Sequence, residues 1–197
     1  IHSIVVNPAD IPTTNKEKVQ KDDKRDSQKI AKALRNGDLV PIYVPCSKTI
    51  EDRSLVRTRS LLVRDSTRTK NRIKSFLYFH GIKLPSPFEN TKTHWSKRFL
   101  DWLESIEMEE DSSKLTLSVL ISECKKLRAT ILTVTRSIRK LSQTEAYVEQ
   151  EKLIRSVPGI GAITAMTMLT EIESISRFSN NDQFHSFVGI IPSTNSS

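Results

Sequence analysis

Residues 153–197 read LIRSVPGIGAITAMTMLTEIESISRFSNNDQFHSFVGIIPSTNSS and contain the most informative pattern of the chain. An apolar helical pattern stops at Pro158 and resumes over residues 162–172, which predicts two helices joined by a tight hairpin. Glycine lets the backbone pass close to a ligand, and the free N–H groups that open a helix can bind phosphate oxygen. We therefore expect Gly159, Ile160 and Gly161 to contact a nucleic-acid backbone. The alternative is a simple connection between two helices.

The charge of the chain favours a polyanionic partner. Its 197 residues include 31 Lys and Arg against 23 Asp and Glu, which gives a net charge of +8 and a pI near 9.6. Nucleic acid is the usual partner of such a protein. No apolar run approaches the roughly 18 residues that a spanning helix needs, so we expect no membrane partner. Cys46 and Cys124 are isolated, which favours a reducing cytosol and no zinc site.

Two short apolar runs frame a helical pattern near the N-terminus. Residues 3–6 and 39–44 are predicted to be strands, and a helix is expected over residues 21–36, closed by Gly37. Strand, helix and strand suggest one parallel crossover unit of an α/β sheet. Pro41 would place the second strand at a sheet edge, because proline cannot donate a hydrogen bond to a neighbouring strand.

Two acidic residues lie at the start of this helix. Asp23 and Asp26 are three residues apart, so both carboxylates project from one helix face and could share a divalent metal ion. A two-metal centre for phosphoryl transfer needs further acidic groups from elsewhere. The ordinary alternative is that the two acids only stabilise the helix N-terminus. Basic residues suited to a phosphodiester substrate surround the pair, namely Lys16, Lys18, Lys21, Lys24, Arg25, Lys29, Lys32 and Arg35.

A long arginine-rich helix is expected over residues 50–79. Between Lys48 and Lys74 the chain has nine basic residues against three acids. Many of the basic residues are spaced for one side of a helix, which favours binding to a nucleic-acid backbone, DNA or RNA undetermined. A merely soluble helix is the alternative. We assign this binding to Arg57, Arg64, Arg68 and Arg72.

The clearest helical period of the chain follows. Apolar residues from Leu117 to Leu141 recur at separations of three and four, which predicts a coiled-coil seam over about three heptads. Its partner is either the arginine-rich helix of the same chain or the same helix of another subunit. The helix is expected to continue through Tyr147 to Arg155 and to lead directly into the hairpin.

Motifs at both ends of the chain resemble one known family. After the hairpin come Glu171, Arg177-Phe178, the segment Gly189-Ile190-Ile191-Pro192 and a terminal serine cluster. This order resembles the C-terminal domain of the DEDD-type bacterial insertion-sequence transposases, the family numbered one hundred and ten. Residues 21–27, KDDKRDS, are similar to the Lys-Thr-Asp-x-x-Asp-Ala motif of that family. Asp23 and Asp26 would then be its third and fourth acids.

The resemblance implies a fold and a set of domains. The expected fold class is α/β plus all-α. Residues 1–47 would be the C-terminal part of a ribonuclease-H-like catalytic domain, residues 48–152 the arginine-rich helix and coiled coil, and residues 153–197 a truncated helix-hairpin-helix transposase domain. The chain is expected to be a central to C-terminal fragment, with the first Asp and the Glu of the acidic set upstream, and to be inactive alone.

The resemblance also implies an activity. The protein would be a DNA transposase, a recombinase of a bacterial mobile element, in the cytoplasm with the nucleoid. Ser197 would be the nucleophile, with Ser196 the second choice, while Asp23 and Asp26 would hold Mg²⁺. Its partners would be DNA, a structured guide RNA and further copies of the chain, joined through the coiled coil so that one subunit's acids meet another's serine. The alternatives are a nonenzymatic nucleic-acid-binding module, an inactive remnant and a coiled-coil scaffold.

Overall fold

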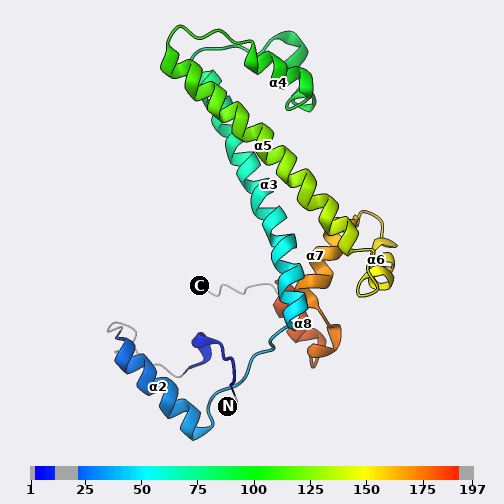
Figure 1. Ribbon diagram of the computed structural model, residues 1–197. Coiled ribbons are helices and arrows are strands. Elements are labelled where there is room, and N and C mark those ends of the chain that lie inside the picture. The colour runs from blue at the N-terminus through cyan, green and yellow to red at the C-terminus, as the bar shows by residue number, and fades with distance from the viewer. Residues whose placement is uncertain (1–2, 12–21, 191–197) are drawn as a thin grey trace, which may run out of the picture. The chain divides into compact units, whose positions relative to one another are not determined.

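The computed structural model describes residues 3–11 and 22–190, and these residues are mostly helical (Figure 1). The chain divides into two compact units, residues 1–47 with 174–197, and residues 48–173. The α-helices are α2 (Asp23–Asn36), α3 (Ser47–Phe79), α4 (Lys97–Glu104), α5 (Asp111–Leu141), α6 (Val148–Arg155), α7 (Ala162–Ile172) and α8 (Asn181–Val188). The short 3-10 helices are η1 (Pro8–Asp10), η2 (Ser86–Phe88), η3 (Thr91–Thr93) and η4 (Ile175–Arg177).

Two long helices, α3 and α5, lie side by side and run in opposite directions in the larger unit (Figure 1). The end of α3 packs against the start of α5 through Ile73, Leu77 and Leu117. The start of α3 packs against the end of α5 through Val56 and Ile138. The predicted seam of α5 therefore packs on the arginine-rich helix of the same chain, which is one of the two partners that the sequence left open.

Aromatic side chains fill the core at the far end of this helix pair. Phe99 of α4 is fully buried, and the rings of Phe88, Trp95 and Trp102 lie between 5.2 and 5.4 Å from it, centroid to centroid. These aromatic side chains belong to the protein core, because large rings gain most by leaving water.

The expected continuous helix from Leu117 to Arg155 is wrong. Helix α5 ends at Leu141, and a turn separates it from α6. Polar side chains bond to the backbone here: the Ser142 hydroxyl donates to the carbonyl of Arg139 at 2.9 Å, and the Thr144 hydroxyl donates to that of Leu141 at 2.8 Å. Such bonds compete with helix continuation. The hairpin is therefore not a direct extension of α5.

The predicted parallel α/β crossover is also wrong for the residues that the structure describes. Val6 and Pro41 form an isolated antiparallel bridge, with the Ile42 amide donating to the Val5 carbonyl at 2.8 Å. No longer strand forms in the described ranges, and the ribonuclease-H-like unit is not seen. A strand needs neighbours on both the hydrogen-bonding edge and the apolar face. Pro41 lacks the amide donor, and Val40 and Val44 remain 68% and 52% exposed.

Candidate catalytic residues and nucleic-acid interface

Helix α2 carries the two predicted metal-binding acids. Asp22 caps the helix, since its carboxylate accepts from the Lys24 amide at 3.3 Å, and Gly37 ends the helix with a left-handed φ of 75°. The cap makes Asp23 and Asp26 first-turn residues, both of them exposed. Both carboxylates are therefore exposed to solvent on the first turn of α2.

The two acids form only part of a metal site. The Asp26 carboxylate also pairs with the Lys29 ammonium at 3.2 Å. Among the described residues, no group of three or more His, Cys, Asp or Glu side chains gathers to hold a metal ion. Hard carboxylate oxygens suit Mg²⁺, which usually takes one or two protein carboxylates together with water and substrate phosphate. Asp23 and Asp26 thus fit half of such a site.

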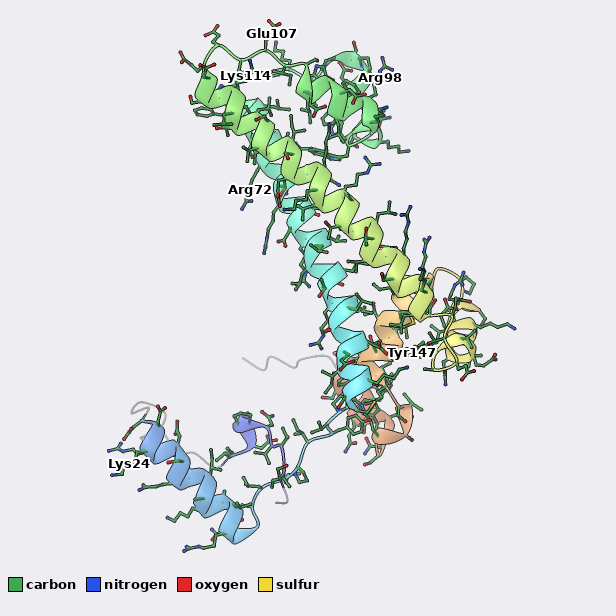
Figure 2. The ribbon with its side chains drawn as sticks, in the orientation of Figure 1. Lys24, Arg72, Arg98, Glu107, Lys114 and Tyr147 are labelled. Carbon is green, nitrogen blue, oxygen red and sulfur yellow. The ribbon has the colours of Figure 1, made fainter. Side chains whose placement is uncertain are left out.

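The predicted arginines of α3 differ in what they contact. Arg64 and Arg72 are exposed, and Arg72 projects from α3 into solvent (Figure 2). Neither forms an ion pair within the part of the chain that the structure describes. Arg68 pairs with Asp65 at 3.1 Å, but both side chains are largely exposed. These three positions present a positive surface, because a surface ion pair of this kind opens easily.

Arg57 instead forms a close pair with Glu171 of α7. Its Nε and Nη2 groups donate to the two carboxylate oxygens at 2.6 and 2.7 Å. This hydrogen bond raises the pKa of Arg57, with a further contribution from the charge of Glu171 and an opposing one from burial. Since the side chain is still 62% exposed, Arg57 could exchange this carboxylate for a phosphate.

The sequence did not reveal a second arginine at this contact, Arg53. Its side chain is only 16% exposed, and its Nε donates to the carbonyl of Thr170 at 2.8 Å. One turn earlier, the Thr49 hydroxyl donates to the Glu173 carboxylate at 2.9 Å. Thr49, Arg53 and Arg57 are four residues apart, so they lie on one face of α3. This spacing is the sequence signal that could have indicated the contact. We call these contacts of α3 with the C-terminal end of α7 the α3–α7 clamp.

The predicted hairpin lies between α6 and α7, at residues 156–161. Gly159 has a left-handed φ of 89°, and the Ile160 amide donates to the Val157 carbonyl at 3.2 Å. Gly161 precedes α7, and no side chain caps the helix there. The first amides of a helix have no partner within it. The first backbone N–H groups of α7 therefore have neither a partner within the helix nor a capping side chain.

The segment after α7 contains a helix that the sequence analysis did not predict. In α8, the Asn180 side chain accepts from the Gln183 amide at 2.9 Å, and the Gln183 side chain accepts from the Ser179 amide at 2.9 Å. Asn followed three residues later by Gln is a known start signal for a helix. Gly189 ends α8 with a φ of 74°. Ser196 and Ser197, the predicted nucleophile positions, lie outside the described residues.

The described helices include none that is long and apolar enough to cross a bilayer. Of the two cysteines, Cys46 is exposed and Cys124 is buried.

Comparisons with known proteins find transposases. Residues 1–81 match the model of a DEDD transposase of the IS110 type, and residues 151–197 match the model described as transposase, IS116/IS110/IS902 family. The chain is 25% identical over 188 residues to the transposase for insertion sequence element IS1533 of Leptospira borgpetersenii. The matched region covers 95% of this chain and 53% of that protein. It is 26% identical over 189 residues to the protein y4qE of Sinorhizobium fredii, covering 96% and 44%.

A further relative is the transposase for insertion sequence element IS1111A of Coxiella burnetii, 25% identical over 188 residues, covering 91% of this chain and 48% of that protein. The chain therefore spans about half the length of the curated relatives it matches. No solved structure matches the chain.

Proposed function

The chain belongs to the IS116/IS110/IS902 family of transposases, and on that premise we propose that it is part of a DNA transposase that cuts and rejoins DNA through a serine nucleophile. One observation carries the proposal. The two family matches fall on the same chain, one over the acids of α2 and the other over the hairpin and the serine segment. The complete protein would be a recombinase of a bacterial mobile element, active in the cytoplasm at the nucleoid.

The proposed chemistry begins at Ser197. Its hydroxyl oxygen attacks a phosphodiester phosphorus, the new oxygen–phosphorus bond links the serine to DNA, and the bond from phosphorus to one deoxyribose oxygen breaks. The serine proton ends on the deoxyribose hydroxyl that leaves. Attack by another DNA hydroxyl on the phosphoserine reverses these steps and joins the strands. Ser196 is the second choice for the nucleophile.

The acids of α2 would serve the phosphate. Asp23 and Asp26 would hold Mg²⁺, which stabilises charge on phosphate oxygens when it is bound. Their exposure on the first turn of α2 supports this role, and the remaining acids would come from residues outside this chain. The basic residues that follow on the same helix would attract the DNA backbone.

The larger unit would bind nucleic acid without reading its sequence. Exposed arginines on α3, at positions 64, 68 and 72, offer charge to the phosphate backbone. The uncapped start of α7 after Gly161 offers backbone N–H donors for one phosphate. DNA is the proposed partner, together with a structured guide RNA and further copies of the chain.

The test is DNA strand exchange with Mg²⁺ by the full-length gene product that contains this chain. We expect Ser197→Ala, Asp23→Ala and Asp26→Ala each to abolish strand exchange, while DNA binding stays close to wild type. Asp22→Ala is the matched control on α2, because Asp22 caps the helix and should lower its stability by about 1 kcal/mol without removing a metal ligand. Retention of activity in Asp23→Ala and Asp26→Ala would refute the metal assignment.

A further inference from the structure

Arg177 lies among aromatic side chains in the smaller unit. Its guanidinium carbon is 4.8 Å from the ring centroid of Tyr43, 4.5 Å from that of Phe178 and 4.4 Å from that of Phe187. Phe178 also contacts Phe187, with ring centroids 5.3 Å apart. Three rings therefore surround one cation, and two separate segments of the chain supply them. We call this group the Arg177 cluster.

Arg177 makes no hydrogen bond and no ion pair with any residue that the structure describes. Its Nε atom is buried and has no acceptor there. The contrast with α3 is clear, because Arg53 and Arg57 both donate to oxygen atoms of α7. A buried donor without an acceptor loses its bond to water and gains none in return, so the native fold retains Arg177 at a cost.

The aromatic rings do not remove this cost. A cation–π contact attracts the charge to a ring face, but it supplies no oxygen to accept the N–H groups. The rings do restrict the side chain, so that less conformational freedom is lost when a ligand binds. Tyr43 and Phe187 are 46% and 48% exposed, and Arg177 itself is half-buried, which leaves the cluster open to a ligand from solvent.

An anion with more than one acceptor oxygen suits the free donors of Arg177 best. Arginine presents planar, paired donors that match phosphate and carboxylate oxygens two at a time. No carboxylate pairs with Arg177 in the described ranges, whereas a chain of net charge +8 attracts polyanions. We propose that Arg177 binds one phosphate of the DNA backbone, held ready for it by Tyr43, Phe178 and Phe187. This inference rests on the proposed function and adds a phosphate-binding residue in the segment that leads to Ser197.

The first test measures how DNA affinity depends on salt. Each phosphate contact contributes about 0.9 to the slope of log affinity against log salt for duplex DNA. We expect Arg177→Met, which keeps an unbranched stem against the rings but has no charge, to lower the slope by about 0.9. Between 50 and 200 mM salt, the variant would then lose about 3.5-fold less affinity than the wild type. Arg177→Lys keeps the charge and should keep the slope.

The matched control is Arg98→Met. Arg98 also lies over an aromatic ring, with its guanidinium carbon 5.9 Å from the centroid of Phe88, but it belongs to the other unit and carries no proposed phosphate. Its removal should leave the slope unchanged. A wild-type slope in Arg177→Met, with lower thermal stability, would show that Arg177 only packs the rings, and the proposed function would stand. A wild-type chain that binds no DNA would refute both.

A second measurement needs no variant. Phenylglyoxal modifies accessible guanidinium groups, and mass spectrometry locates the modified arginines. We expect saturating duplex DNA to protect Arg177 and to leave Arg98 reactive. Equal modification of Arg177 with and without DNA would overturn the proposal, even if Arg177→Met failed to fold.

Discussion

In the α3–α7 clamp, the arginine with the longer contact to Glu171 should contribute more to the free energy of unfolding. Arg57 has the shorter contact with Glu171, 2.6 Å against 3.6 Å for Arg53. However, Arg57 is 62% exposed and Arg53 only 16%. Solvent weakens an exposed ion pair to about 0.2–1 kcal/mol. The charged bond from Arg53 to the Thr170 carbonyl is shielded from water and should contribute about 1.5–3 kcal/mol. The burial of Arg53 should therefore affect folding stability more than the shorter distance of Arg57.

The comparison uses Arg53→Met and Arg57→Met, which both keep an apolar stem and lose the charged donors. Urea unfolding followed by tryptophan fluorescence reports the larger unit, because both tryptophans lie within residues 48–173. We expect the unfolding free energy to fall by about 1.5–3 kcal/mol for Arg53→Met and by less than about 1 kcal/mol for Arg57→Met, with unchanged urea dependence. A larger loss for Arg57→Met would refute the argument from burial.

Two more predictions follow from local geometry. Gly161→Ala should weaken DNA binding, because glycine lets the backbone pass close to a phosphate. It should leave the melting temperature unchanged, because an added Cβ meets no protein atom within 4 Å and the φ of −91° suits alanine. A lower melting temperature with wild-type affinity would contradict this. Burial raises the pKa of the Cys124 thiol, partly offset by the charges of Lys70 and Arg128. The folded state thus favours the neutral thiol. The contribution of Cys124 to the free energy of unfolding is fully present below the ordinary thiol pKa of about 8.5, and it is lost as the pH rises through the pKa of the folded state. Urea titrations at pH 7 and pH 10 should show that the free energy of unfolding falls less between these pH values in Cys124→Ala than in the wild type. Thiol reagents should modify Cys46 long before Cys124.

Local sequence signals predicted α3 and α7 well. The arginine-rich pattern over residues 50–79 became α3, and residues 162–172 became α7 with the predicted bounds. Helical period, proline and glycine act over a few residues, so these elements can be read without knowing the rest of the fold. The break after Leu141 and the start of α8 at Asn180 also had local signals, in polar side chains that bond to nearby backbone.

The contacts between distant segments could not be read in this way. Arg53 meets Thr170 across 117 residues, and Arg177 meets Tyr43 from the other end of the chain. Neither contact follows from spacing, because each depends on how whole helices pack. The predicted strands were wrong for the same reason, since residues 3–6 and 39–44 offer apolar runs but a sheet is fixed by its neighbours. Asp23, Asp26 and Ser197 remain predictions from the family motif.

The most direct test of the proposed function is to map a covalent link between the protein and DNA. The full-length gene product would be incubated with its DNA and Mg²⁺, denatured, digested with protease and nuclease, and analysed by mass spectrometry. We predict a nucleotide mass on the peptide that contains Ser197, and its disappearance in Ser197→Ala but not in Ser193→Ala. A link at Ser196 would correct the residue and keep the mechanism. Strand exchange that proceeds normally in both Ser197→Ala and Ser196→Ala would contradict the serine mechanism itself.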